Sequence, residues 1–250
     1  MTGRRHVDAS QPNQDNYAIE NFDDSAICIV SDVAGSRLYS EIGSRLVVDL
    51  ALAYLKNQVG IGFNFANKTQ LLTMSRELIS RMKCAAKSKA TEKELDFKEY
   101  AATFHAVVVA KNSLAYIHLG DGALVFINDN GEYQLANIPI KGEYINQTVF
   151  FTSDGAEQAV ETFFLPYVPE FFSLATDGIE NISLIYKDWS VHAPIFDYLR
   201  GFFNHECPKE VLQKFLCREE IEARSDDDKT VIIARNLHKC DESYEGVYEH

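Results

Sequence analysis

Carboxylates stand at the ends of five segments that read as β-strands. They are, in chain order, Asp15 before NYAI, Asp32 after SAICIVS, Asp121 in AYIHLGDGALV, Asp177 after FFSLAT, and the run Asp226, Asp227, Asp228 before KTVII. A carboxylate at the tip of a buried strand is costly unless a positive group meets it. Strand ends can converge at one edge of a sandwich, so these residue types in this pattern could form one acidic site.

Several carboxylates brought together repel each other, and a hard divalent cation relieves that repulsion most directly. An all-oxygen site without nearby cysteine or histidine suits Mg²⁺ or Mn²⁺. The alternative is local, because Asp-Gly is a common turn dipeptide and aspartate accepts hydrogen bonds from neighbouring N–H groups. The spacing alone leaves both interpretations open.

The elements that must position these residues follow from hydrophobic periodicity. Two amphipathic helices are expected at 40–59 and 67–93, the second with Leu71, Met74, Leu78 and Met82 on its apolar stripe. Two more helices are expected at 193–204 and 208–220. Strands are expected at 25–32, 100–111, 113–122, 123–129, 132–138, 148–154, 171–178 and 229–236, with a hairpin turn at NDNG, 128–131.

This order predicts an α+β fold with helices packed outside antiparallel sheets. No linker rich in proline, glycine or serine divides the chain, so residues 1–237 are expected to form a single domain. The tail from 238 to 250 has little reason to be ordered.

Composition narrows the functional classes. The chain has 250 residues, 46% of them hydrophobic, and a formal net charge of −13. That charge disfavours electrostatic binding to nucleic acid or to an anionic membrane. No apolar signal-peptide core or membrane-spanning run is predicted, and five scattered cysteines without a CxxC motif predict reduced thiols in the cytoplasm.

The acidic motifs carry a family resemblance. NQD, SDVAGS, GDG, ATDGIEN and DDDKTV, in this order, resemble the motifs of metal-dependent type 2C protein phosphatases. GRRH…PNQDN, DVAGS…SEIG, IKGEYINQTVFFTSD and SDDDKTV are more specifically similar to the compact bacterial, PphC-like branch. The resemblance extends from about Gly3 to Arg235.

What the resemblance implies is a four-layer α-β-β-α sandwich with a two-metal site for Mn²⁺ or Mg²⁺ at one end of its two sheets. By position, Asp32 would bridge both ions, the Val33 carbonyl would bind the second, and Asp177 and Asp227 would complete the first. Asp15 would order metal-bound water, and Asp121 matches the residue of a third, looser site. The implied reaction is hydrolysis of phosphoserine or phosphothreonine by a metal-activated water. Its substrate would be a protein phosphorylated by a serine/threonine kinase.

Three positions depart from the family pattern. Val33 stands where the family has glycine, and valine resists positive φ, which predicts weaker binding of the second metal. Gln14 replaces a commonly acidic neighbour, and Ala34 replaces a histidine that serves as a candidate general acid in eukaryotic relatives. These departures keep open a catalytically weak or silent pseudophosphatase that regulates a phosphoprotein or kinase. A small-molecule phosphatase is a further alternative, because fold does not fix substrate.

The phosphate-binding position also differs. The family places an arginine in a G-x-x-R stretch, and here Gly3-Arg4-Arg5-His6 places histidine there. His6 is therefore a candidate to contact the phosphate or to protonate the leaving group, with a surface histidine of no role as the alternative. Arg4 or Arg5 could clamp the phosphate instead. His105 and His118 lie within strands and are interpreted as core residues, and Ser36 and Ser153 lack a positioned base.

Overall fold

The computed structural model describes residues 1–10, 12–22, 24–33, 40–138 and 148–237. The expected C-terminal tail, Ala34 and Ser36 therefore lie outside the described residues. The helical segments are α1 (Arg4–Asp8), α2 (Ser40–Gly60), α3 (Lys68–Glu92), η1 (Phe97–Tyr100), α4 (Ala156–Ala159), η2 (Asp177–Ile179), α5 (Glu180–Ser183), α6 (Ala193–Gly201), η3 (Phe202–Asn204), α7 (Pro208–Leu216) and α8 (Glu219–Glu222). The strands are β1 (Asn16–Phe22), β2 (Ser25–Ser31), β3 (Phe104–Ala110), β4 (Ser113–Leu119), β5 (Ala123–Ile127), β6 (Tyr133–Leu135), β7 (Glu161–Leu165), β8 (Phe171–Ala175), β9 (Leu184–Ile185), β10 (Ser190–Val191) and β11 (Val231–Arg235).

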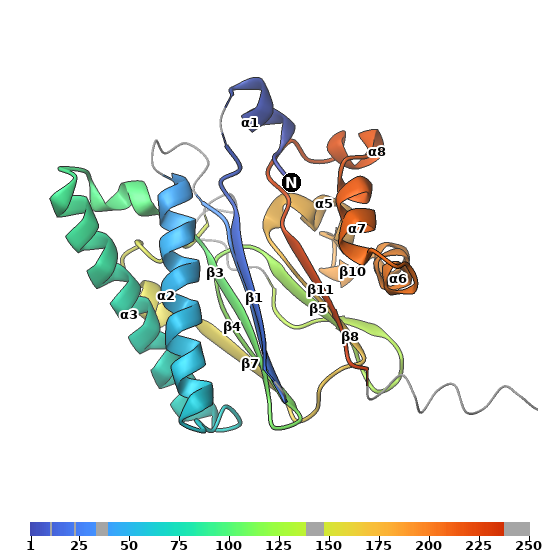
Figure 1. Cartoon of the computed structure of the whole chain (residues 1–250), viewed down its shortest axis with the longest axis horizontal. Coiled ribbons are helices and arrows are strands. Elements are labelled where there is room, and N and C mark those ends of the chain that lie inside the picture. The colour runs from blue at the N-terminus through green and yellow to red at the C-terminus, as the bar shows by residue number, and fades with distance from the viewer. Residues whose placement is uncertain (11, 23, 34–39, 139–147, 238–250) are drawn as a thin grey trace, which may run out of the picture.

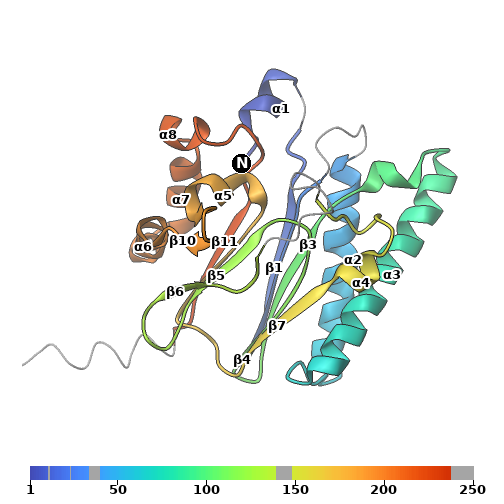
Figure 2. The same ribbon diagram turned by 180° about the vertical axis from the view of Figure 1, so that it is seen from behind.

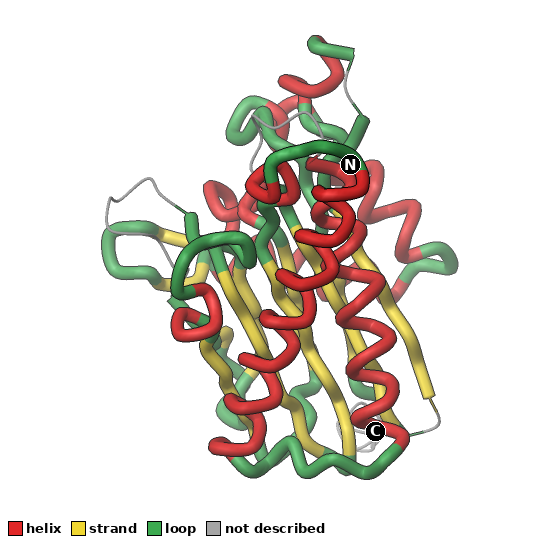
Figure 3. Tube along the Cα trace, turned by 90° about the vertical axis from the view of Figure 1, so that its left-hand side faces the viewer, coloured by secondary structure: helices red, strands yellow, loops and turns green. Residues whose placement is uncertain are grey.

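Two antiparallel sheets face each other at the centre of the molecule (Figures 1 and 2). One has the strand order β1-β2-β3-β4-β7 and the other the order β11-β8-β5-β6. Helices α2 and α3 cover the outer face of the five-stranded sheet (Figure 3), and α5 to α8 lie outside the four-stranded sheet. The expected four-layer α-β-β-α arrangement is confirmed.

Each pair of layers encloses its own apolar cluster. Leu71, Met74, Leu78 and Met82 of α3 are buried against the five-stranded sheet, as the periodicity predicts. Val30, Val107 and Tyr116 belong to the cluster between the sheets. Phe171, Phe196, Phe202 and Phe215 pack between the four-stranded sheet and the helices over it. Burial of this apolar surface is the main source of stability, and it holds the strand ends in fixed relative positions.

Several expected elements differ from the observed ones. Residues 148–154 do not form a strand: the Ser153 hydroxyl accepts a hydrogen bond from the Phe150 N–H, and the Ser153 N–H donates to the Phe150 carbonyl. These local bonds and Gly155, at φ 72°, close a turn before α4. The expected helix at 208–220 ends at Leu216, and α8 starts separately at Glu219. Strand β7, which pairs with β4, was missed by the periodicity.

Candidate metal centre and active site

Asp32 follows β2 directly, and the segment before β3 holds its main chain. The Asp32 N–H donates to Thr103 Oγ1 at 2.9 Å, and the Thr103 N–H donates to the Asp32 carbonyl at 2.7 Å. The Asp32 Oδ1 atom accepts from the Val33 N–H at 2.6 Å, and Val33 forms an antiparallel bridge with Ala102. The carboxylate is thus fixed at the end of β2, an inner strand of the five-stranded sheet, rather than in a free turn.

Asp15 and Asp177 reach the same place from β1 and from the end of β8. Asp15 is 8% exposed, and its Oδ2 accepts from the Thr176 hydroxyl at 2.8 Å. Thr176 directly precedes Asp177, so one short segment contacts one acidic residue and carries another. Asp15 Oδ1 and Asp177 Oδ1 are buried atoms with no hydrogen-bond partner among the described residues. Two orphaned carboxylate oxygens in one region indicate a place for a positive group.

The electrostatics of these carboxylates are coupled. Burial raises the pKa of Asp32 well above its usual range, and the neighbouring Asp15, Asp177 and Asp227 raise it further. Burial also raises the pKa of Asp177 well above its usual range, and the charges of Asp121 and Asp227 raise it further. The pKa of Asp15 is raised by burial, although hydrogen bonds, the first of them with Asp32, partly oppose that rise. The five predicted aspartates therefore act on one another as a single cluster.

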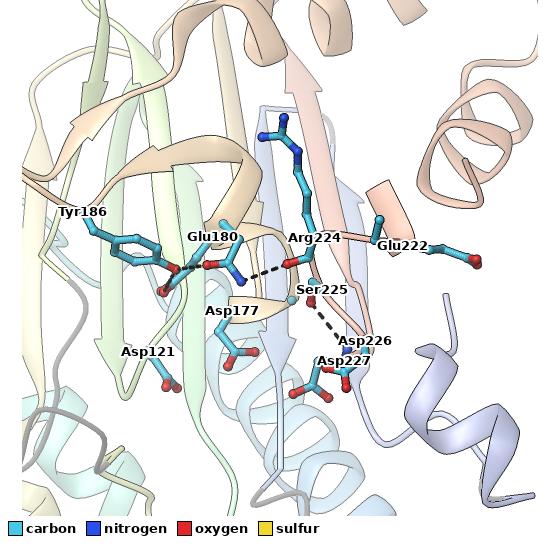
Figure 4. A pocket seen from close by; sticks show the side chains of 12 residues that line it. Asp121, Asp177, Glu180, Tyr186, Glu222, Arg224, Ser225, Asp226 and Asp227 are labelled. Atoms are coloured by element: carbon cyan, nitrogen blue, oxygen red, sulfur yellow. Dashed lines mark hydrogen bonds between the residues drawn. The ribbon is translucent and has the colours of Figure 1, made fainter. Parts of the chain in front are cut away.

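Asp121 and Asp227 face a cleft of about 480 Å³ beside this cluster. In Figure 4 the carboxylates of Asp121, Asp177 and Asp227 point toward the same opening. The Thr148 hydroxyl donates to Asp121 Oδ2. The Arg5 guanidinium lies 3.0 Å from Asp227 Oδ1, with 45% of its side chain exposed, so a cation already stands at the margin of the acidic cluster.

Asp228 ties the N-terminal segment to β11. Its carboxylate is 2% exposed and accepts hydrogen bonds from the Gly3 N–H at 2.7 Å and the Gln14 N–H at 2.5 Å. His6 Nδ1 lies 3.0 Å from Asp228 Oδ1, a distance suited to an ion pair, although its angle is not that of a hydrogen bond. His6 is 2% exposed, so it is not the surface histidine considered as an alternative. It lies inside the joint that places Asp15 and Asp227.

Val33 carries none of the strain that its sequence position suggested. It is absent from the five described non-glycine residues with positive φ, namely Ser10, Glu94, Lys111, Asn112 and Trp189. Its side chain is 4% exposed and packs in the cluster under α2 and α3. A valine is therefore compatible with this backbone, and the main reason to expect a weak second metal site is removed.

The donor chemistry fits a divalent cation, but the donors are not assembled around one point. Across the ranges that the structure describes, no three histidine, cysteine, aspartate or glutamate side chains are grouped so that they could hold one ion. The Asp227 carboxylate is paired with the Arg5 guanidinium, and the Asp32 carboxylate accepts a hydrogen bond from the Val33 N–H. The two orphaned oxygens and the mutual repulsion nevertheless match a hard cation such as Mg²⁺, which binds proteins through one or two carboxylates and keeps several of its own waters. We expect small side-chain movements to complete such a site.

The comparison with known families agrees with the geometry. The sequence profile described as "Protein phosphatase 2C" matches residues 2–217 of this chain. This chain belongs to the protein phosphatase 2C family. Serine/threonine-protein phosphatase 3 of Escherichia coli (strain K12) is 30% identical over 246 residues, which span 93% of this chain and 94% of that protein.

Solved structures share the protein phosphatase 2C fold. Serine-threonine phosphatase 2C from Toxoplasma gondii aligns with a TM-score of 0.63 at 15% identity, over 92% of this chain and 91% of that one. The catalytic domain of the phosphatase PstP, in complex with two manganese ions, aligns with a TM-score of 0.59 at 17% identity, over 89% and 90%. A bacterial serine phosphatase aligns with a TM-score of 0.62 at 17% identity, over 90% and 92%.

Three residues hold the candidate site together. Thr103 fixes Asp32, Thr176 fixes Asp15, and Asp228 joins the two chain ends. Thr103 and Thr176 were not singled out from the sequence, and Asp228 was named there only as a member of the acidic run. His105 and His118 are buried, as expected for core residues, and Ser153 lies in a turn. Arg4 is exposed on α1.

Proposed function

We propose that this chain hydrolyses phosphoserine and phosphothreonine in proteins at the cluster formed by Asp15, Asp32, Asp121, Asp177 and Asp227. Membership of the protein phosphatase 2C family makes it a protein serine/threonine phosphatase, which is a hydrolase. The observation that carries the residue assignment is geometric: Asp121, Asp177 and Asp227 line one cleft, and Asp15 Oδ1 and Asp177 Oδ1 are buried with no partner among the described residues. A silent regulatory protein would have no need to retain this costly arrangement, so we do not favour the pseudophosphatase alternative.

Two divalent ions, Mn²⁺ or Mg²⁺, would supply a nucleophilic water near neutral pH and would offset the charge of the phosphate. Asp32 would contact both ions, Asp177 and Asp227 the first, and the Val33 carbonyl the second. Asp15 would orient water through the oxygen that has no partner. Asp121 would serve a third, looser site. The Thr103 and Thr176 bonds keep Asp32 and Asp15 in place while the charges around them change.

Arg5 is our choice for the residue that binds the phosphate. Its guanidinium is close to Asp227 and 45% exposed, so it can turn between a carboxylate and an incoming phosphate, both of which it can hold bidentately. Arg4 is the alternative candidate for binding the phosphate, since its side chain is exposed and it lies two positions before the buried His6. His6 acts through Asp228 in this proposal, as a positioning residue rather than as a general acid.

The cleft beside the cluster gives room for a phosphorylated side chain and its neighbours. We take the substrates to be proteins phosphorylated by a serine/threonine kinase in a bacterial cytoplasm. The four described cysteines are free thiols, as a reducing compartment favours. No described helix has the length and apolar character needed to cross a bilayer.

The test is hydrolysis of phosphoserine and phosphothreonine peptides by the whole protein, with Mn²⁺ or Mg²⁺ titrated against a chelator control. We expect turnover that appears with metal and is lost on chelation. A small phosphorylated metabolite is the competing substrate in a parallel assay. Turnover of the metabolite alone would replace the protein-substrate assignment, and no turnover of any phosphoester at any metal concentration would favour the regulatory alternative.

A further inference from the structure

Three buried aromatic rings form a stack between the sheets that the proposed reaction does not use. His105 of β3 stacks on Tyr116 and on His118 of β4, with ring centroids 6.2 Å apart in both pairs. Tyr116 and His118 stack at 5.0 Å. The exposed fraction of each side chain is 2% or less. Two histidines and a tyrosine are polar residues in an otherwise apolar layer, so their hydrogen bonds must be accounted for.

When its ring is neutral, the hydrogen bonds of His105 admit only one arrangement of protons. Its Nε2 lies 2.6 Å from the carbonyl oxygen of Asp121, and its Nδ1 lies 2.9 Å from the Tyr116 hydroxyl. A carbonyl can only accept, so Nε2 must carry the proton. The Nδ1 atom of the neutral ring then accepts, and Tyr116 must donate to it. Burial agrees with both states, since it lowers the pKa of His105 to about 4 and raises the pKa of Tyr116 far above its usual range.

Asp121, whose carbonyl accepts the hydrogen bond from His105, lies in a turn whose backbone is held on both sides. Gly120 and Gly122 have φ of 103° and 117°, a region that favours glycine. The Gly122 N–H donates to Glu180 Oε1 at 3.2 Å, and the Gly122 carbonyl accepts from the Asn137 amide at 3.3 Å. A Cβ on Gly122 would lie 2.9 Å from His105 Nε2, which shows how closely the imidazole approaches the turn.

We propose that His105 is a positioning residue, whose Nε2–H fixes the Asp121 carbonyl so that the Asp121 carboxylate faces the metal cluster. Thr148 holds the carboxylate itself, so Asp121 is fixed at two points, one on the main chain and one on the side chain. This inference rests on the proposed function, in which Asp121 serves the loosest metal site. Outer partners that orient a metal ligand typically change metal affinity by about 10–100-fold when removed.

The test compares Mn²⁺ binding to metal-stripped whole protein by calorimetry, for wild type, His105→Phe, His105→Gln and Asp121→Asn. Phenylalanine keeps the ring and removes the donor, whereas glutamine can donate to Asp121 and accept from Tyr116. We expect His105→Phe to weaken the loosest binding event about tenfold, and His105→Gln to restore it to within about threefold. Asp121→Asn should weaken it at least as much as His105→Phe does. The tighter events should not change in the His105 variants.

The matched control is His118→Phe. His118 pairs directly with His105 in the strand register, is similarly buried and contacts the same tyrosine. Among the described residues its other polar partners are Asn137 and Glu161 rather than Asp121. It should lower the melting temperature by a similar amount and leave all Mn²⁺ binding within about twofold of wild type, because it is not an outer partner of a ligand. Equal weakening by His118→Phe would mean a general packing effect and would overturn the proposal.

Other outcomes separate the two levels of inference. If Asp121→Asn weakens the loosest event and His105→Phe does not, the positioning role is wrong while the metal assignment stands. If neither variant changes binding, Asp121 is not a ligand and that part of the proposed function fails. If His105→Phe does not fold, His105→Leu replaces it, because leucine also removes the Nε2–H donor and keeps an apolar side chain in the buried layer. Unchanged binding in His105→Leu, with the loosest event weakened in Asp121→Asn, would then reject the proposed bond.

Discussion

Asp177 shows what a single residue contributes to the balance between stability and activity. Burial and the nearby charges of Asp121 and Asp227 disfavour the ionised form of its carboxyl group. One of its oxygens has no hydrogen-bond partner among the described residues. In the metal-free protein the charge therefore opposes folding, whereas with a cation present the same charge would be needed. We therefore expect a bound cation to relieve the electrostatic repulsion around Asp177.

Replacement of Asp177 by asparagine should separate these two effects. We expect Asp177→Asn to keep or raise the melting temperature in chelator, because a repulsive charge is removed at constant size. Mn²⁺-dependent phosphopeptide turnover should fall by about 10²-fold or more, since a ligand of the metal is lost. Asp32→Asn should behave alike. The control is Asp154→Asn at an exposed turn position, which should change neither quantity. Full turnover in both cluster variants would rule out the metal assignment.

Val33 allows a sharper distinction between strain and packing. The sequence suggested that glycine would bind metal better, but the observed backbone is not left-handed and the side chain is buried. We now expect Val33→Gly to cost about 2–4 kcal/mol in the free energy of unfolding, from lost burial and added chain entropy. The Mn²⁺ concentration for half-maximal turnover should not fall. Chemical denaturation and a metal titration measure the two effects, and tighter metal dependence would show hidden strain in the native loop.

At the scale of elements, Asp228 joins two parts of the chain that begin and end the fold. It accepts hydrogen bonds from Gly3 and Gln14, which flank α1, while it directly precedes the segment that leads into β11. Gly3 and Gly178 show how tight the joint is, since a Cβ on either would lie about 2 Å from the main chain of Asp227 or Asp228. The geometry of Asp15 and Asp227 depends on this joint.

Replacement of Asp228 by alanine should therefore loosen one element and weaken the site. Two buried N–H donors would lose their acceptor, at about 1–3 kcal/mol each before relaxation. We expect Asp228→Ala to destabilise the protein by about 2–4 kcal/mol and to increase amide hydrogen exchange at residues 3–16. Asp226→Ala, an exposed neighbour in the same acidic run, is the matched control and should change the free energy of unfolding by less than about 0.5 kcal/mol. Unaltered hydrogen exchange in Asp228→Ala would contradict the claim that Asp228 holds the N-terminal segment in place.

At the scale of the whole molecule, two sets of buried groups give stability opposite pH dependences. The pKa values of Asp15, Asp32 and Asp177 are raised in the fold, so the native state binds protons that the unfolded chain releases. Their contribution to metal-free stability falls as pH rises from the unfolded value, about 4, through the raised values. Burial lowers the pKa of His105 to about 4 and of His118 to about 3, so their contribution is lost as pH falls below about 6.5.

A comparison of variants separates these opposing contributions. In chelator, the stability advantage of Asp177→Asn over wild type should be largest at alkaline pH and should narrow as pH falls through the raised carboxyl pKa values. The two histidines are present in both proteins and cancel in the difference. With saturating Mn²⁺ the sign should reverse, because the wild type gains binding free energy that the variant lacks. Thermal melting across pH 5–8 measures this, and a difference that does not depend on pH would show that Asp177 has an ordinary pKa.

The sequence by itself determined the layers and the places of the acidic residues. Helical periodicity in 67–93 and the apolar runs of the strands are properties of neighbouring residues, and the sheets and helices they predicted are observed. The glycine turn around Asp121 follows from its dipeptides in the same way. The local signal was misleading at 148–154, where the Ser153 side chain helps to form a turn. It was absent at β7, the edge strand that pairs with β4.

Only the tertiary structure decided how those acidic residues are held and which cations stand near them. The bond from Gly3 to Asp228 joins residues 225 positions apart, and Thr176 reaches Asp15 across 161. Sequence neighbours carry no information about such pairs, because they depend on the order of strands in both sheets and on how the layers pack. The same packing buries His6, leaves Arg5 beside Asp227, and turns His105 from a core residue into a partner of Asp121.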